Sequence, residues 1–366
     1  MTPQKVGTSY YAHTFPGLQS VAWSEARARL RNVRLEGTAE VRARNGLVFL
    51  DYPGDARDML ALRTIEDLFV VTTRLSEVPW GREGLATIFE NLRSGQGLGR
   101  ALHIWQWLTG ARVSRNVTFR VIARLSGARQ PYRRLDLERA VASAVRRATK
   151  GRWQLVDSGE DVELWANLIH RQFICGLRLS DATLRHREYK QEHLPGSLRP
   201  SVAAALVWLS GPQPTDIFLD PLCGSGTVLI ERALTGRHTL LLGGDNDEAA
   251  LVAAKANIGR KHKPRQLFRW DAGHLPLRAE SVHRIATNLP FGKRHGSPDT
   301  VQALYRRVLT EMARVLVPGG RAVLLCASER WMDDAAALEP SLATIQRQRI
   351  LLLGQPATIH VMEKRR

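Results

Sequence analysis

The most unusual short stretch of the sequence is TNLPFGKRHG, which begins at Thr287 and follows the short strand-like segment 282–286 (VHRIA). The carboxamide oxygen of Asn288 and the main-chain carbonyl beside Pro290 can both accept hydrogen bonds from an exocyclic amino group. Pro290 lacks an N–H and has a fixed φ, which keeps the turn rigid. The stretch therefore predicts a site that aligns an amine nitrogen for reaction.

The next residues suggest that this amine belongs to a nucleotide base. Phe291 offers a flat face to a base taken out of its stack, and Lys293 and Arg294 can hold the adjacent phosphates. Asn288 is not a general base at neutral pH, so catalysis would depend on alignment and hydrogen bonding. Taken alone, the stretch is better explained as an ordinary turn after a strand.

A glycine-rich turn at residues 220–227 (DPLCGSGT) lies between an apolar segment and a helical pattern at 228–236. This order of strand, glycine turn and helix lets the backbone approach a nucleotide-like ligand closely. The turn lacks a Walker lysine and the full dinucleotide spacing, which disfavours a dehydrogenase. Asp220 would attract a cationic ligand. S-adenosylmethionine, with an ammonium and a sulfonium, fits that charge.

Two more acidic residues stand at the ends of predicted strands. Asp245 stands nineteen residues after Gly226, where a ribose-binding carboxylate is expected. Asp271 is placed to accept from an adenine amino group, and Ala272 could supply a backbone donor. Either acid alone would more often be a helix cap or a turn residue. Because the carboxyl ends of strands converge in a doubly wound sheet, the four strand ends together predict one site.

The order of elements predicts several domains. From residue 202 onward strands alternate with helices, which predicts an α/β, doubly wound, Rossmann-like domain over 202–366. Two α+β units precede it, over 1–75 and 76–180, the second closing with a strand-like stretch. We predict a linker without regular structure over 181–201, since the Pro195-Gly196 pair and Pro200 interrupt it.

The strand-like stretch that closes the second unit is DVELWANLIHRQFICGLRL, residues 161–179.

The three cysteines, Cys175, Cys223 and Cys326, are too far apart for a CxxC metal site or a disulfide framework, so no metal is predicted. No apolar run approaches the roughly 18 residues of a membrane span, and no secretory core follows the first residues. We therefore predict a cytoplasmic protein without a membrane partner.

The charge of the chain indicates a polyanionic partner. Of 366 residues, 53 are Lys or Arg and 35 are Asp or Glu, for a net charge of +18. Residues 112–152 carry twelve of these cations against two acids, on a strand pattern followed by a helical one. Such a segment can bind a phosphate backbone, although it could also be a solvated arginine-rich face or bind a membrane surface. Candidate RNA contacts are Arg112, Arg115, Arg129, Arg133 and Arg134.

Three motifs together resemble a known family. Residues 220–227, residues 288–294 (NLPFGKR) and residues 195–200 (PGSLRP) resemble those of the THUMP-domain tRNA guanine-N2 methyltransferases. More loosely, residues 15–18 resemble the start of the family's N-terminal ferredoxin-like domain, and residues 176–180 the end of its THUMP domain. The resemblance covers almost the whole chain. It implies that the two α+β units are a ferredoxin-like domain and a THUMP domain.

The resemblance also implies S-adenosylmethionine-dependent methylation of a guanosine N2 in tRNA, at position 6 of the acceptor stem, with the first two domains gripping the 3′-CCA end. The implied base-binding residues are Asn288, Leu289, Pro290 and Phe291. The implied cofactor-binding residues are Ser197, Leu198, Asp220, Cys223, Gly224, Gly226, Thr227, Asp245, Asp271, Ala272 and Asn288.

The motif departs from Asn-Pro-Pro-Tyr, which many amino-methyltransferases carry, at Leu289 and Phe291. The missing tyrosine hydroxyl keeps adenine N6 open as a target. The sequence also fits a guanine-N2 methyltransferase that acts on ribosomal RNA or at a different tRNA position, or a non-catalytic RNA-binding protein. The intact glycine turn and Asn288 argue against a non-catalytic role. The number of methyl groups, the proton acceptor, the oligomeric state and any activating partner protein stay open.

Overall fold

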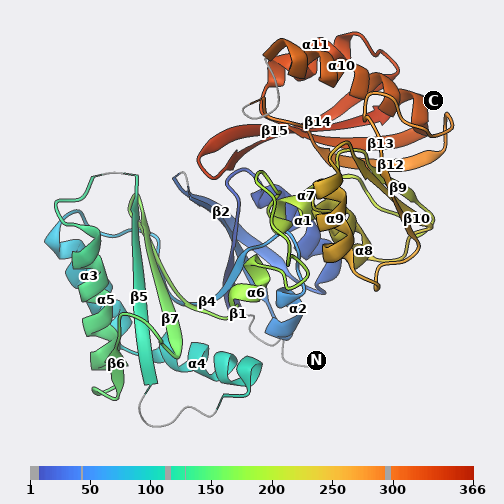
Figure 1. Cartoon of the computed structure of the whole chain (residues 1–366). Coiled ribbons are helices and arrows are strands. Elements are labelled where there is room, and N and C mark those ends of the chain that lie inside the picture. Colours follow the sequence, from blue (N-terminus) through green and yellow to red (C-terminus); the bar gives the residue numbers. More distant parts are fainter. Residues whose placement is uncertain (1–7, 43, 112–116, 128, 293–297) are drawn as a thin grey trace, which may run out of the picture. The chain divides into compact units, whose positions relative to one another are not determined.

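The computed structural model describes residues 8–42, 44–111, 117–127, 129–292 and 298–366 (Figure 1). The chain forms two compact units, Met1–Arg185 and His186–Arg366. The division falls inside the predicted linker 181–201, whereas the other predicted domain boundary, between residues 75 and 76, stays a prediction. Within the described ranges, no helix combines the length and the apolar character needed to cross a membrane.

The first unit contains an eight-stranded sheet in the order β2-β3-β1-β4-β8-β7-β5-β6. Its strands are β1 Thr8–Thr14, β2 Arg34–Val41, β3 Asn45–Tyr52, β4 Asp67–Leu75, β5 Val117–Ser126, β6 Trp153–Leu155, β7 Val162–Ile169 and β8 Gln172–Arg178. Its helices are α1 Gln19–Arg29, α2 Ala56–Leu60, α3 Arg82–Arg93, α4 Gln96–Thr109, α5 Arg134–Ala148 and α6 Ala182–Arg185. The elements from β1 to β4 follow the βαββαβ order of ferredoxin-like folds.

The helix α5 shows how the basic segment of this unit is built. Its apolar residues at three-to-four spacing, such as Leu137, Val141 and Val145, are buried in the main core of the unit. Figure 1 shows α3 and α5 side by side next to β5 and β7. The helical pattern predicted for the later part of residues 112–152 is confirmed, and Arg133 and Arg134 are exposed at the start of α5.

The strand-like pattern of residues 161–179 is confirmed, and the stretch contains two strands. They form the antiparallel hairpin of β7 and β8, with Ile169 opposite Gln172. His170, at a φ of +54°, turns the chain between them, and its N–H donates to the carbonyl of Ser126 at 2.7 Å. The exposed polar residues His170 and Arg171 form the two-residue turn between the two buried strands.

The second unit contains a seven-stranded sheet in the order β11-β10-β9-β12-β13-β15-β14. Its strands are β9 Ile217–Asp220, β10 Leu240–Asp245, β11 Arg265–Arg269, β12 Val282–Asn288, β13 Leu316–Cys326, β14 Leu342–Leu352 and β15 Gln355–Lys364. Strands β9 to β13 are parallel, and β15 runs antiparallel to both of its neighbours. The predicted α/β, Rossmann-like fold of this half is confirmed.

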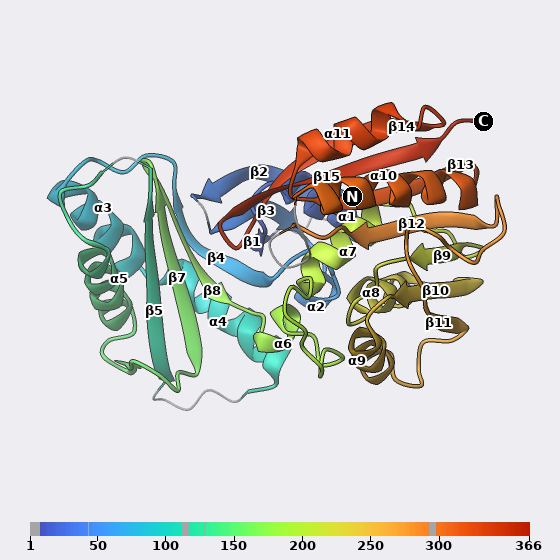
Figure 2. The same ribbon diagram turned by 45° about the horizontal axis from the view of Figure 1, so that its top comes forward.

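Helices cover both faces of this sheet. They are α7 Pro200–Leu209, α8 Thr227–Thr235, α9 Glu248–Ile258, α10 Pro298–Val315 and α11 Glu329–Ala337. Figures 1 and 2 show α8 and α9 on one face and α10 and α11 on the other. The prediction that Pro200 resists regular structure was wrong, because Pro200 is the first residue of α7, where its missing N–H costs no helical hydrogen bond.

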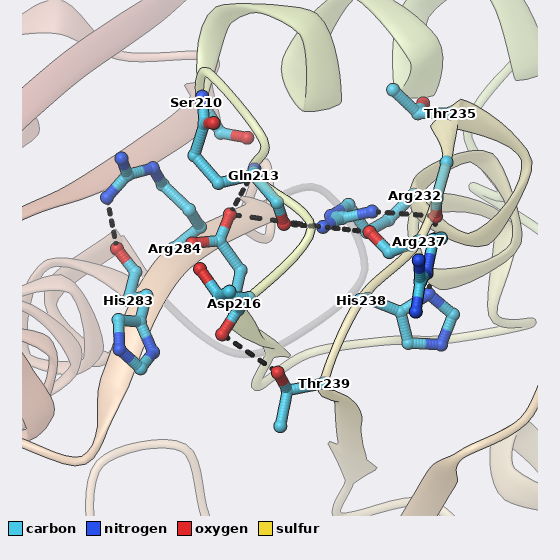
Figure 3. A network of polar contacts seen from close by, with 12 residues as sticks. Ser210, Gln213, Asp216, Arg232, Thr235, Arg237, His238, Thr239, His283 and Arg284 are labelled. Atoms are coloured by element: carbon cyan, nitrogen blue, oxygen red, sulfur yellow. Dashed lines mark hydrogen bonds and ion pairs between the residues drawn. The ribbon is translucent and has the colours of Figure 1, made fainter.

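A polar network secures the amino ends of β9 and β12 (Figure 3). Arg232 of α8, only 1% exposed, donates to the carbonyls of Gln213 at 2.6 Å, Arg237 at 3.1 Å and Gly236 at 3.2 Å. The N–H of Gln213 donates to Asp216 at 2.6 Å, and the Arg232 guanidinium lies 3.9 Å from the same carboxylate. The network therefore joins the loop before β9 to the loop before β10, at the edge opposite the carboxyl ends of the strands.

Candidate active site

The glycine turn is held in place by the neighbouring strand. The N–H of Cys223 donates to the carbonyl of Gly244 at 2.9 Å, and the N–H of Gly224 donates to Asp245 Oδ2 at 3.0 Å. Gly226 has a φ of +80°, and a Cβ there would lie 3.1 Å from Ile258. These contacts require glycine at position 226 and place bare backbone at the carboxyl end of β9.

The ends of β10 and β11 meet the same turn. Trp270 packs against Gly244, where a Cβ would clash with the indole, and its Nε1 donates to the carbonyl of Pro221 at 3.0 Å. Asp271 accepts from the N–H of Gly273 at 2.8 Å and pairs with Arg307 at 3.1 Å. The three strand ends expected to share one edge do so, and the predicted roles of Asp245, Asp271 and the buried Ala272 in cofactor binding stay predictions.

A short hydrogen bond joins β9 to β12. Asp220, 1% exposed, accepts from the hydroxyl of Thr287 at 2.6 Å and from the N–H of Leu222 at 3.3 Å. Burial raises the pKa of Asp220 to about 7, because water is excluded from its charged form. The carboxyl group that the sequence assigns to the cofactor site therefore also fixes the residue before Asn288.

Asn288, the last residue of β12, has a buried carboxamide oxygen without a hydrogen-bond partner within the described part of the chain. A buried acceptor without a donor costs roughly 1–3 kcal/mol, so this oxygen suits a ligand that brings an N–H. Of the predicted base-binding residues, Leu289 is fully buried and its N–H donates to the carbonyl of Leu325 at 2.9 Å. The chain thus leaves the Asn288 oxygen available at the strand end.

The turn after Asn288 is supported from α10 and α11. The hydroxyl of Tyr305 donates to the carbonyl of Pro290 at 2.9 Å. A Cβ at Gly292 would lie 3.3 Å from the ring of Trp331, and Phe291 is partly buried. The Pro290 carbonyl already has this donor, whereas the Asn288 oxygen has none among the described residues.

The connector before α7 contacts the glycine turn. The hydroxyls of Ser197 and Ser225 are 3.1 Å apart. The side-chain N–H₂ of Asn257 donates to the carbonyls of Ser225 and Glu192, both at 3.0 Å, and its oxygen accepts from the N–H of Glu192 at 2.8 Å. The structure therefore brings Ser197 and its neighbour Leu198 next to the turn that also contains the buried Thr227.

Three of the seven predicted RNA-binding residues lie within the described part of the chain. Arg129, Arg133 and Arg134 are exposed, near or at the start of α5 in the first unit. The other four candidates, Arg112, Arg115, Lys293 and Arg294, lie outside the described residues.

Sequence reasoning did not identify Thr287, Tyr305 or Asn257. Their contacts join residues distant in sequence, and no local pattern encodes such pairs. Of these three residues, only Asn257 could have been identified from the sequence, because it is a polar residue on the apolar face of α9, in line with Ala250 and Ala254.

The strand order and the residues at the carboxyl ends of β9, β10, β11 and β12 define a Rossmann-like methyltransferase fold. The bare backbone at Gly226, the carboxylate of Asp245 and the unpartnered oxygen of Asn288 fit an adenosyl ligand beside an amine substrate.

Comparison with known proteins agrees with the assignment of a methyltransferase fold. Residues 187–352 match the family of RMKL-like methyltransferase domains. The chain is 31% identical to the tRNA (guanine(6)-N2)-methyltransferase of Thermus thermophilus, over 96% of this chain and 98% of that protein. The crystal structure of TrmN from Thermus thermophilus superposes with a TM-score of 0.77 at 29% identity, over 98% of this chain and 99% of that chain. The chain belongs to the family of the tRNA (guanine(6)-N2)-methyltransferases, as its motifs indicate.

A longer relative matches only in part. The bovine protein named tRNA (guanine(6)-N(2))-methyltransferase THUMP3 is 34% identical over 59% of this chain, and the match spans 45% of the bovine protein. The chain thus spans less than half of that relative.

Proposed function

We propose that this protein transfers a methyl group from S-adenosylmethionine to the exocyclic N2 of a guanosine in tRNA, at position 6 of the acceptor stem. The observation that carries the proposal is the buried oxygen of Asn288 beside the glycine turn, which has no hydrogen-bond partner among the described residues. Family membership supports the choice of guanine N2 over adenine N6, because the Thermus thermophilus relative is named for that atom.

The residues of the site would act by alignment. When bound, S-adenosylmethionine supplies an electrophilic methyl group on a sulfonium. The Asn288 oxygen accepts a hydrogen bond from the guanine amino group and directs its nitrogen toward that methyl carbon. The hydrogen bond between Asp220 and Thr287, at 2.6 Å, fixes the end of β12 on which Asn288 lies. The nitrogen gives up one proton to solvent after transfer.

The basic first unit supports an RNA substrate. Arg129, Arg133 and Arg134 are exposed where α5 begins, and a net charge of +18 favours phosphate binding. We propose that this unit contacts the acceptor stem and the 3′-CCA end, and that the reaction takes place in the cytoplasm. Cell fractionation tests the last point.

The reaction is tested with purified protein, unmodified tRNA transcripts and S-adenosylmethionine labelled on its methyl group. After digestion to nucleosides, chromatography and mass spectrometry identify the labelled product. We expect N2-methylguanosine, and we expect no label in a matched transcript in which guanosine 6 and its pairing partner are exchanged. Ribosomal RNA fragments serve as competing substrates.

Three results would each correct the proposal. Label in N6-methyladenosine would refute the assignment to guanine. Label that persists in the exchanged transcript would move the target to another guanosine. Label in ribosomal RNA but not in tRNA would refute the substrate class while leaving the methyl transfer.

A further inference from the structure

The connector before α7 contains a partly buried lysine whose charge has no carboxylate partner. The ammonium of Lys190 donates to the main-chain carbonyl of Leu198 at 2.6 Å. Among the described residues, no Asp or Glu forms an ion pair with it. One of its three N–H donors is therefore used by a neutral oxygen, and two are available.

The surroundings of Lys190 make this arrangement costly. Burial and the nearby charge of Arg199 lower the pKa of Lys190 to about 8. Two cations without an anion between them repel each other, and partial burial strengthens the repulsion. A ligand that brings a negative charge would remove this cost.

The position of Lys190 limits what that ligand can be. Its acceptor Leu198 is next to Ser197, whose hydroxyl lies 3.1 Å from that of Ser225 in the glycine turn. Asn257 fixes the same two segments with three hydrogen bonds of 2.8 to 3.0 Å. The lysine thus belongs to a segment held against the turn where the adenosyl ligand is proposed to bind.

We propose that Lys190 binds the carboxylate of the methionine part of S-adenosylmethionine. This inference rests on the proposed function, because the carboxylate is the single anionic group of that ligand. The ammonium keeps its bond to the Leu198 carbonyl and donates a second, charge-assisted hydrogen bond to the ligand. Lys190 would then set the affinity for the cofactor and contribute little to the transfer step itself.

The test compares two ligands that differ in the carboxylate alone. Isothermal titration calorimetry on the full chain measures the affinity for S-adenosylmethionine and for decarboxylated S-adenosylmethionine. We expect Lys190→Met to weaken binding of the first by about tenfold or more and to leave binding of the second unchanged. Lys190→Arg should restore most of the loss. Lys255→Met, an exposed lysine of α9, is the matched control and should change neither affinity.

Other outcomes would overturn the inference. An equal loss for both ligands in Lys190→Met would mean that the residue supports the fold of the site, and thermal unfolding of the variant would show it. A loss of tRNA binding alone would assign the lysine to a phosphate. Equal affinity of the unaltered protein for the two ligands would refute the role of Lys190 and leave the proposed cofactor unaffected. If neither ligand bound, the proposed cofactor itself would be refuted.

Discussion

The two ends of the parallel strands in the second unit use polar groups in different ways. At the amino ends, Arg232 donates three hydrogen bonds to loop carbonyls and lies 3.9 Å from Asp216. At the carboxyl ends, the Asn288 oxygen is buried without a partner among the described residues, and Asp220 is buried with a pKa raised to about 7. One edge gains stability from its polar groups, and the other keeps groups ready for a ligand at some cost in stability.

The largest expected effect is that of Asn288→Ala. If the amide only aligns the substrate, its removal should lower methyl transfer by about 10²–10³-fold, as for other positioned hydrogen-bonding groups. The melting temperature should stay the same or rise slightly, because an unpartnered buried acceptor is lost. Single-turnover transfer and calorimetry measure the two quantities. A large drop in melting temperature would mean that the two edges do not differ as described.

The opposite result is expected for Arg232→Met. Loss of the buried guanidinium leaves three carbonyls without this donor and Asp216 without its ion-pair partner, which should lower the free energy of unfolding of the second unit by about 3 kcal/mol. Differential scanning calorimetry of the full chain measures the change. Transfer by the folded fraction should stay near normal. The exposed Arg237→Met is the control, and equal losses in both variants would contradict the role of the network.

The pH dependence of stability sharpens the comparison. An unfolded Asp has a pKa of about 3.9, whereas burial raises that of Asp220 to about 7. Between these values only the folded state keeps the proton, so stability falls as pH rises from about 4 to about 7 and is constant above. Because one pKa unit corresponds to about 1.4 kcal/mol, Asp220→Asn should become more stable than the unaltered protein by at least that amount at pH 8. Equal pH profiles would show that Asp220 is ionised in the fold.

The smallest effect is expected at Tyr305. Its hydroxyl donates to the Pro290 carbonyl at 2.9 Å, and one such bond contributes about 1 kcal/mol. Tyr305→Phe should therefore slow transfer by about fivefold through a looser turn after Asn288, with little change in the KM for S-adenosylmethionine. Steady-state kinetics with tRNA separates these constants. An unchanged rate would mean that Trp331 and Leu289 hold the turn without the hydroxyl.

Local patterns in the sequence predicted three of the four strand ends of the site, at Asp220, Asp245 and Asn288, whereas the strand predicted to end at Asp271 ends at Arg269. Each apolar segment of the parallel sheet stops at a residue that cannot continue it, such as Asp245 or Asn288, and parallel topology then brings these residues to one edge. The strand-like pattern over residues 161–179 is likewise confirmed by β7 and β8, and the exposed polar residues His170 and Arg171 mark the turn between them.

The supporting contacts could not be predicted in the same way. Tyr305 reaches Pro290 from α10, and Asn257 reaches Glu192 across 65 residues of chain. Such pairs depend on helix packing angles, which hydrophobic spacing does not determine. The sequence therefore identified the residues at the strand ends and missed those that hold them.

The placement of β15 has a consequence for how the protein is made. The last strand of the sheet lies between β13 and β14, which were synthesised before it. Until residues 355–364 leave the ribosome, β13 and β14 both present unpaired backbone groups at open strand edges. The first unit can fold while translation continues, since nascent domains fold in order from the N-terminus. The second unit cannot complete its sheet until β15 has emerged, so β13 and β14 keep open edges up to that point of translation.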